Sequence, residues 1–162
     1  MKFIHPQEDH WHPVSGEDGP QVHPDNKGNC LLSLEQWHAV RDGWPANLAV
    51  ALELSNTVDV LTLASDLSRI AMISLQFPKW VDGRAYTQAR LLRQRLGFKG
   101  EIRAKGDVLV DMMQLLERTG FNAVHLRADQ DQAAAKRALS FFSAYYQGDT
   151  QGRNPLFART AV

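Results

Sequence analysis

The chain has 162 residues, enough for one domain with a sizeable core. Its 18 basic and 18 acidic side chains balance, so we expect no extended basic surface for nucleic acid or membranes. No apolar run reaches the roughly 20 residues that span a bilayer, and the opening residues lack the apolar core of a signal sequence. The single cysteine, Cys30, cannot form an internal disulfide, and we expect a cytoplasmic protein.

Three parts are expected along the chain. Four of the seven prolines lie in the first 30 residues, which predicts an irregular segment with a short strand. Ser33, followed by Gln36 at the capping-box position, predicts the start of a short helix. We therefore expect an irregular N-terminal segment at 1–45, an α/β domain at 46–147 and a flexible tail at 148–162.

Strands and helices are predicted to alternate in the central part. Apolar runs bounded by turn residues predict strands at 48–54, 70–77, 101–105 and 123–127. A polar connection with a short helix is predicted at 59–68, and longer helices at 83–96, 108–119 and 130–146, the first two capped by Asp82 and Asp107. This order predicts a mainly parallel sheet with right-handed crossovers.

One face of the predicted sheet is polar. Glu101, Arg103 and Lys105 alternate with Ile102 and Ala104, and the other predicted strands also carry polar residues on one face. A parallel sheet covered on both faces would be apolar on both. We therefore expect helices chiefly on one face, as in a half-barrel. The polar face could then face solvent, bind a ligand or be closed by a second copy, and we expect a homodimer.

Charged residues follow the predicted strands, and the carboxyl ends of parallel strands meet at one rim. Guanidinium and ammonium groups bind oxyanions, and the N–H groups of two helix N-termini would add to the attraction. The alternative is that the aspartates are helix caps and the cations are their salt-bridge partners. The residues predicted to bind a small oxyanion are Lys79, Asp82, Arg84, Arg103, Lys105 and Arg127.

The candidates for catalysis are His125, Asp107 and Asp111. The two aspartates lie four residues apart on one helix face, where they could hold Mg²⁺ or share a proton, although a cap and a first-turn dipole partner are the commoner roles. No metal site is predicted. The sequence also lacks a dinucleotide fingerprint, a phosphate loop and a set of cysteines, so the cofactor stays unknown.

An ordered set of motifs lies within residues 70–127. It consists of Phe77-Pro78-Lys79, Asp82-Gly83-Arg84-Ala85-Tyr86, Ala89-Arg90-Leu91-Leu92-Arg93, Gly100-Glu101-Ile102-Arg103-Ala104, Gly106-Asp107-Val108, Asp111 and Gly120-Phe121. This set resembles an uncharacterised bacterial family described as oxidoreductases involved in sulfite reduction. The resemblance implies a role in sulfur assimilation and cysteine biosynthesis.

Two functions follow from this resemblance. Sulfite reduction needs a redox cofactor, and the sequence carries no fingerprint for one. We therefore expect an accessory or oxyanion-binding component that works with sulfite reductase or its electron donor. The alternative is a small enzyme, an oxidoreductase or another type, that acts on a sulfur-pathway metabolite at the cationic rim.

Overall fold

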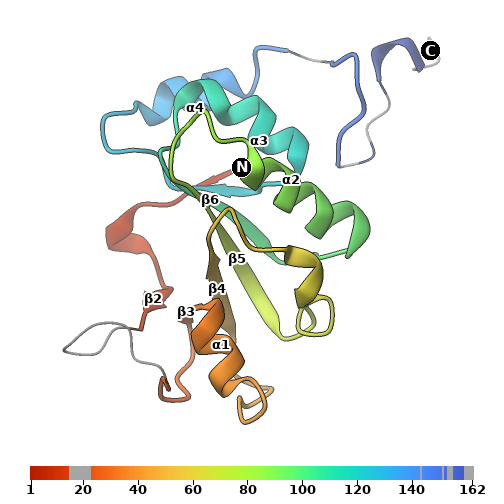
Figure 1. The fold of residues 1–162 in the computed structure, drawn as a ribbon. Coiled ribbons are helices and arrows are strands. Elements are labelled where there is room, and N and C mark those ends of the chain that lie inside the picture. Colours follow the sequence, from red (N-terminus) through yellow and green to blue (C-terminus); the bar gives the residue numbers. More distant parts are fainter. Residues whose placement is uncertain (15–22, 143, 151, 153–154, 159–162) are drawn as a thin grey trace.

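The computed structural model describes residues 1–14, 23–142, 144–150, 152 and 155–158. Within these residues, seven parallel strands form one sheet in the order β1-β7-β6-β5-β4-β3-β2 (Figure 1). The strands are β1 (Lys2–Phe3), β2 (His12–Pro13), β3 (Cys30–Ser33), β4 (Val50–Leu54), β5 (Ile70–Phe77), β6 (Glu101–Gly106) and β7 (Ala123–Val124). The sheet curves into a half-barrel, and the predicted α/β fold is confirmed.

Four α-helices are found in the described residues: α1 (Leu34–Val40), α2 (Arg84–Arg90), α3 (Met113–Thr119) and α4 (Gln132–Ala138). A π-helical turn, η3 (Leu91–Arg95), continues α2, so the helix predicted at 83–96 is confirmed to within one residue at each end. The 3₁₀ turns are η1 (Pro6–Glu8), η2 (Val60–Leu63), η4 (Val110–Met112) and η5 (Leu156–Ala158). Among the described residues, no helix has the length and apolar character needed to cross a membrane.

The core lies between the sheet and the helices. Leu52 on β4, Leu75 on β5 and Ile102 on β6 are fully buried there, together with Leu92 and Leu116 from the covering helices. The alternate residues of these strands face the opposite, concave side of the half-barrel. The predicted division of the sheet into an apolar, helix-covered face and a polar face is therefore correct.

The N-terminal segment crosses the concave face. β1 and β2 lie at opposite edges of the sheet, so residues 4–11 must pass across one of its faces (Figure 1, red). Trp11 is buried against Leu31 and Met72, which belong to the side opposite the main core. Residues 1–45, expected to be irregular with one short strand, contribute β1, β2 and β3 to the sheet. Residues 4–11 among them cover part of the polar face.

Two predicted boundaries are wrong for a local reason. Gly106 ends β6 with a φ of +103°, and the chain turns away from its neighbour there. The strand predicted at 123–127 therefore loses its partner: His125 N–H still donates to Ala104 C=O, but Arg127 N–H donates to Val108 C=O. The same turn delays the helix predicted at 108–119, which begins as η4 at Val110.

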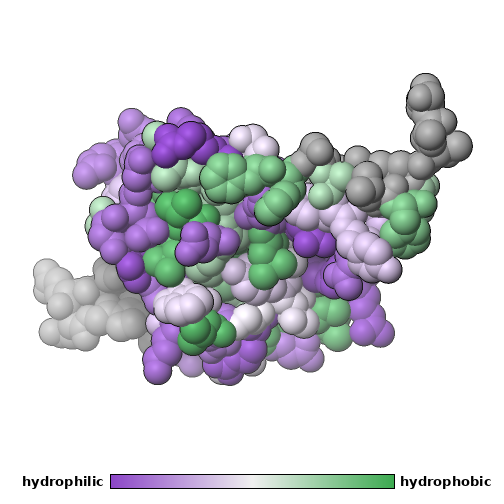
Figure 2. Space-filling view, turned by 90° about the horizontal axis from the view of Figure 1, so that it is seen from above, coloured by the Kyte–Doolittle hydropathy of each residue, from purple (hydrophilic) through white to green (hydrophobic). Residues whose placement is uncertain are grey.

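The last predicted helix, 130–146, is also shorter than expected. α4 ends at Ala138, and the aromatic residues beyond it do not join the core. Phe141, Phe142 and Tyr146 are 68%, 62% and 79% exposed. Seen from above, apolar side chains lie among charged ones on the surface of the molecule (Figure 2).

Gly106→Ala should destabilise the protein by more than about 2 kcal/mol, measured by chemical denaturation. A Cβ at this position would lie 2.4 Å from the carbonyl oxygen of Phe77, and the positive φ disfavours any side chain. Gly97→Ala is the matched control, because Gly97 also has a positive φ, +66°, but has no atom within 4 Å of the added Cβ. The control should lose only about 1 kcal/mol. Equal losses would show that the close approach to Phe77 is unimportant.

Candidate functional site

A cavity of about 230 Å³ lies on the concave face, between the sheet and the N-terminal segment. We call it the concave cavity. The sheet contributes polar groups to its wall, and the crossing segment contributes the opposite side. The residues that matter for its chemistry are Asp9, Trp11, Ser74, Arg103, Lys105 and His125.

Arg103 is the most deeply buried charge in this wall. Its side chain is only 4% exposed, because β6 is an inner strand of the sheet and the N-terminal segment covers it. The guanidinium donates through Nε and Nη2 to Glu101, at 3.0 and 2.8 Å, and through Nη1 to Asp9, at 2.5 Å. Two carboxylates thus compensate one buried cation, as the burial of a charge requires.

Ser74 and Lys105 complete the polar wall. Ser74, on β5, is 1% exposed, and its hydroxyl has no hydrogen-bond partner among the described residues. Lys105 donates to both carboxylate oxygens of Glu53, at 2.9 and 3.1 Å. Glu53 also accepts a hydrogen bond from Gln76 at 2.5 Å. The wall therefore joins β4 to β6 through a charge pair and β4 to β5 through the Gln76 amide, and the Ser74 hydroxyl in it has no hydrogen bond among the described residues.

The cavity retains hydrogen-bond donors after these pairs are formed. An arginine has five N–H groups and a lysine has three. The bonds described above use three of the five on Arg103 and two of the three on Lys105. These groups and the hydroxyl of Ser74 are of the kind that donates to the oxygens of a small anion.

His125 follows β7 and lines the same cavity. Burial lowers the pKa of its imidazole below the ordinary value of 6.5, the charges of Lys105 and Arg103 lower it further, and His5 adds a small effect in the same direction. Asp9 opposes the shift. His125 is therefore neutral at pH 7, and its imidazole can accept a proton as well as donate a hydrogen bond.

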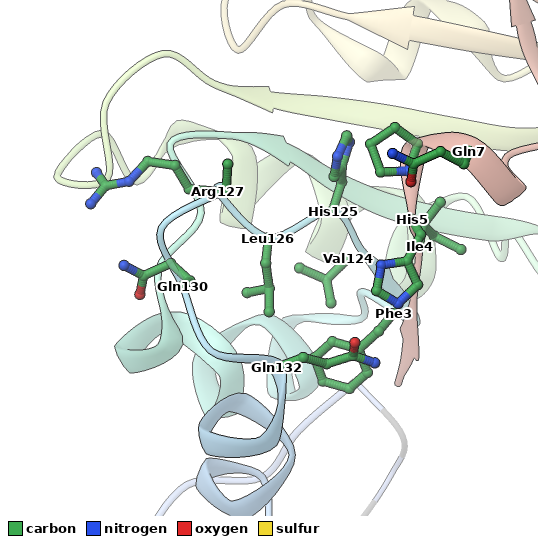
Figure 3. Close-up of a pocket in the computed structure, with 12 residues that line it drawn as sticks. Phe3, Ile4, His5, Gln7, Val124, His125, Leu126, Arg127, Gln130 and Gln132 are labelled. Atoms are coloured by element: carbon green, nitrogen blue, oxygen red, sulfur yellow. The ribbon is translucent and has the colours of Figure 1, made fainter.

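A second hollow, the end pocket, adjoins the concave cavity at the ends of β1 and β7. It has a volume of about 400 Å³, and it shares Pro6 and His125 with the concave cavity. Val124 and Leu126 point toward the helices, whereas His125 points to the other side, toward Gln7 (Figure 3). Ligands of open α/β sheets bind at the carboxyl ends of the strands, and the end pocket lies at the ends of β1 and β7.

The outer rim is organised around Asp107. Its carboxylate accepts the N–H of Trp80 at 2.9 Å and a guanidinium hydrogen of Arg127 at 2.6 Å. Arg127 also holds Asp129 at 2.6 and 2.7 Å. These contacts lower the pKa of Asp107, lower that of Asp129 to about 2 and raise that of Arg127. Asp107 thus links the loops after β5, β6 and β7, and its predicted role as a helix cap is wrong.

The predicted role of Asp82 as a helix cap is confirmed in part. Its carboxylate accepts the N–H of Arg84 at 3.3 Å, which supports the predicted role at the helix start, although Gly83 occupies the N-cap position. It also binds the Arg84 guanidinium at 2.7 Å and Asn56 at 2.8 Å. The hydrogen bond from Arg84 is the largest cause of the lowered pKa of Asp82.

The predicted ligand-binding residues therefore separate into groups. The structure brings together Arg103, Lys105 and His125 in the concave cavity. Arg84 borders a different hollow, beside η2. The other predicted residues belong to the rim or are exposed near it: Lys79, Asp82, Asp107, Asp111 and Arg127.

Sequence reasoning missed two residues of the site. Ser74 carried a usable signal, because the alternation of β5 assigns it to the polar face, but a serine there resembles any solvated residue. Asp9 carried none, because it lies in the Pro-rich segment and is 94 residues from Arg103 in sequence. Among the described residues, no three His, Cys, Asp or Glu side chains are grouped so that they could hold a metal ion.

Acidification should reveal the environment of His125. Because its pKa is lower in the folded state than the ordinary 6.5, the unfolded chain binds the proton first. Its contribution to stability is therefore complete above pH 6.5 and is lost as the pH falls toward the folded-state pKa. The unfolding free energy should decrease as the pH falls through 6.5 toward the folded-state pKa, and His125→Gln should reduce that decrease.

The rim aspartates do not interfere in this range. Their lowered pKa values make stability fall only when the pH drops below their ordinary value of 3.8. The exposed His38 provides the control variant, His38→Gln, which should leave the slope unchanged. An unaltered slope in His125→Gln would contradict the account of its surroundings.

Comparison with known proteins relates this chain to one protein family. A family model described as a bacterial protein of unknown function (DUF934) matches residues 51–157. No match was found among curated proteins. The matched region contains β5, β6 and β7 and the helices α2, α3 and α4, and with them the cavity residues Ser74, Arg103 and His125. The chain therefore belongs to this bacterial family of unknown function.

Proposed function

We propose that the protein binds a small oxyanion in the concave cavity and acts as an accessory component of assimilatory sulfite reduction. The observation that carries the binding part is the hydroxyl of Ser74, which is buried without a partner among the described residues. A buried polar group without a hydrogen bond costs about 1–3 kcal/mol. An anion oxygen in the cavity would relieve that cost.

The charges around the cavity set a condition on anion binding, because three carboxylates face two cations. Arg103 and Lys105 have unused donors, but Asp9, Glu101 and Glu53 already compensate them. Glu101 and Glu53 lie on strands, whereas Asp9 lies on the crossing segment, after η1. Asp9 is therefore the carboxylate with which an entering anion competes, and we expect modest affinity.

The link to sulfur metabolism comes from the motif resemblance. Sulfite and sulfate are small oxyanions, so the proposed ligand class agrees with a partnership with sulfite reductase or its electron donor. The homodimer expected from the polar face stays a prediction. The N-terminal segment now provides part of the cover that a second copy was expected to supply.

A small enzyme is the second candidate, and His125 is the observation in its favour. Burial and neighbouring cations lower the pKa of this imidazole, so it is available as a base at neutral pH beside the proposed oxyanion. Turnover of a sulfur-pathway metabolite by the isolated protein, lost in His125→Gln, would favour this candidate over a purely accessory role.

Ser74→Ala tests the binding site without disturbing an existing bond. Because the hydroxyl has no partner, its removal should leave stability unchanged or raise it by about 1 kcal/mol. The affinity for sulfite and sulfate should fall about tenfold, since a hydrogen bond to a charged group contributes about 1.5–3 kcal/mol. Calorimetric titration measures the affinity, and denaturation measures the stability.

Two further variants sharpen this test. Ser68→Ala, at an exposed serine, is the matched control and should change neither quantity. Asp9→Asn should raise the anion affinity, because it removes the competing carboxylate from Arg103. If the wild-type protein binds neither anion, or if Ser74→Ala binds as well as wild type, the concave cavity is not an oxyanion site.

The partnership is tested separately. The tagged full-length protein should retain sulfite reductase or its electron donor from an extract of the native bacterium, identified by mass spectrometry. An unrelated tagged protein of similar size and neutral charge is the control. Retention of neither component above the control level would contradict the accessory role and would leave only the oxyanion site to be judged.

A further inference from the structure

The end pocket and the concave cavity share Pro6 and His125 in their walls, and they differ in chemistry. The concave cavity has charged and hydroxyl groups in its wall. The end pocket, shown in Figure 3, has an apolar floor of Phe3, Val124 and Leu126. Two adjoining hollows of unlike chemistry fit a ligand with two unlike ends.

The polar side chains around the end pocket are three amides, the imidazoles of His5 and His125, and the guanidinium of Arg127. Gln7, Gln130 and Gln132 border it. Gln130 accepts the Val110 N–H at 3.0 Å through its carbonyl oxygen and also forms a side-chain hydrogen bond to Asp129, which leaves the amides of Gln7 and Gln132 for a ligand. No carboxylate or ammonium group is among the described residues that line this pocket. Its one guanidinium, Arg127, is held by Asp107 and Asp129. The pocket therefore suits an uncharged group that has hydrogen-bonding capacity.

Size supports the same division. Pockets for organic ligands have volumes of about 300–1,000 Å³. The end pocket, at about 400 Å³, lies within this range, and the concave cavity, at about 230 Å³, lies below it. A free inorganic oxyanion would fill part of the smaller hollow and would leave the larger one to water.

We infer that the ligand is an organic molecule with an oxyanion at one end and an uncharged, partly apolar body at the other. The oxyanion lies against Ser74, Arg103 and Lys105, and the body occupies the end pocket between its apolar floor and its glutamine amides. His125, which contacts both hollows, lies beside the bond that joins the two ends. This inference rests on the proposed oxyanion site and specifies its substrate class.

Two sulfonates with the same headgroup test the inference. Methanesulfonate offers the head with one methyl group, and N-acetyltaurine adds a short chain with an amide. In calorimetric titration of the full-length protein, N-acetyltaurine should bind at least about tenfold more tightly, because only its body reaches the end pocket. Ser74→Ala should weaken both ligands by a similar factor.

Ala128→Trp separates the two hollows. Ala128 is exposed and borders the end pocket, so a tryptophan there should obstruct the pocket without disturbing the core. The variant should lose the preference for N-acetyltaurine and keep the wild-type affinity for methanesulfonate. Ala133→Trp, at an exposed residue of α4 that does not line the pocket, is the control and should keep the preference.

The outcomes distinguish this inference from the proposed function. Equal affinities of the wild-type protein for the two sulfonates, or a preference that survives in Ala128→Trp, would overturn the inference and leave the oxyanion site intact. If methanesulfonate, N-acetyltaurine, sulfite and sulfate all fail to bind, the oxyanion site is wrong and the inference fails with it.

Discussion

The buried guanidinium of Arg103 is the group on which the concave side of the molecule depends. A cation that is 4% exposed can stay charged only if its hydrogen-bond donors find acceptors. Glu101 supplies one acceptor from the same strand, and Asp9 supplies another from the far end of the chain. The pair with Asp9 adds to the pairings of β1 and β2 that hold the N-terminal segment over the sheet, and this segment turns an open polar face into a walled cavity.

Charged residues at the rim of the sheet stabilise the loops that follow the strands. At the rim, Asp107 joins three consecutive strand ends through Trp80 and Arg127, which keeps the loops at fixed positions. Because the cations there are held by carboxylates in exposed positions, they contribute little free attraction for an anion. The groups best placed to bind an anion therefore lie on the face of the sheet, where burial strengthens the hydrogen bonds that the remaining donors can form.

The fold could be predicted where the sequence has a clear period. The strands at 70–77 and 101–105 are long enough for alternation to identify both their type and their polar face. β1, β2 and β7 have two residues each, and two residues carry no period. Their places in the sheet depend on contacts between distant parts of the chain, such as the hydrogen bond from Ile4 to Val124.

The site was predicted in part for similar reasons. Arg103, Lys105 and His125 were recognisable because each is a polar residue that alternates with apolar ones in a predicted strand, and the structure brings them to one cavity. Asp107 was misjudged because an aspartate before an apolar helix resembles a cap. The positive φ of Gly106 redirects the backbone at that point, and the carboxylate meets the N–H of Trp80 instead. Sequence patterns do not record such a turn.

The sheet order also has a consequence for how the chain acquires its structure during synthesis. β1 is made before the other strands of the sheet, and among the described residues it pairs with β7 alone, so its hydrogen-bonding edge has no partner until β7 has left the ribosome. The inner strands from β3 to β6 pair with neighbours close in sequence and can assemble earlier, since short loops are closed at lower entropic cost. Docking of the N-terminal segment is then a late step. A shortened chain that ends before β7 would leave β1 unpaired and the concave side without its secured cover.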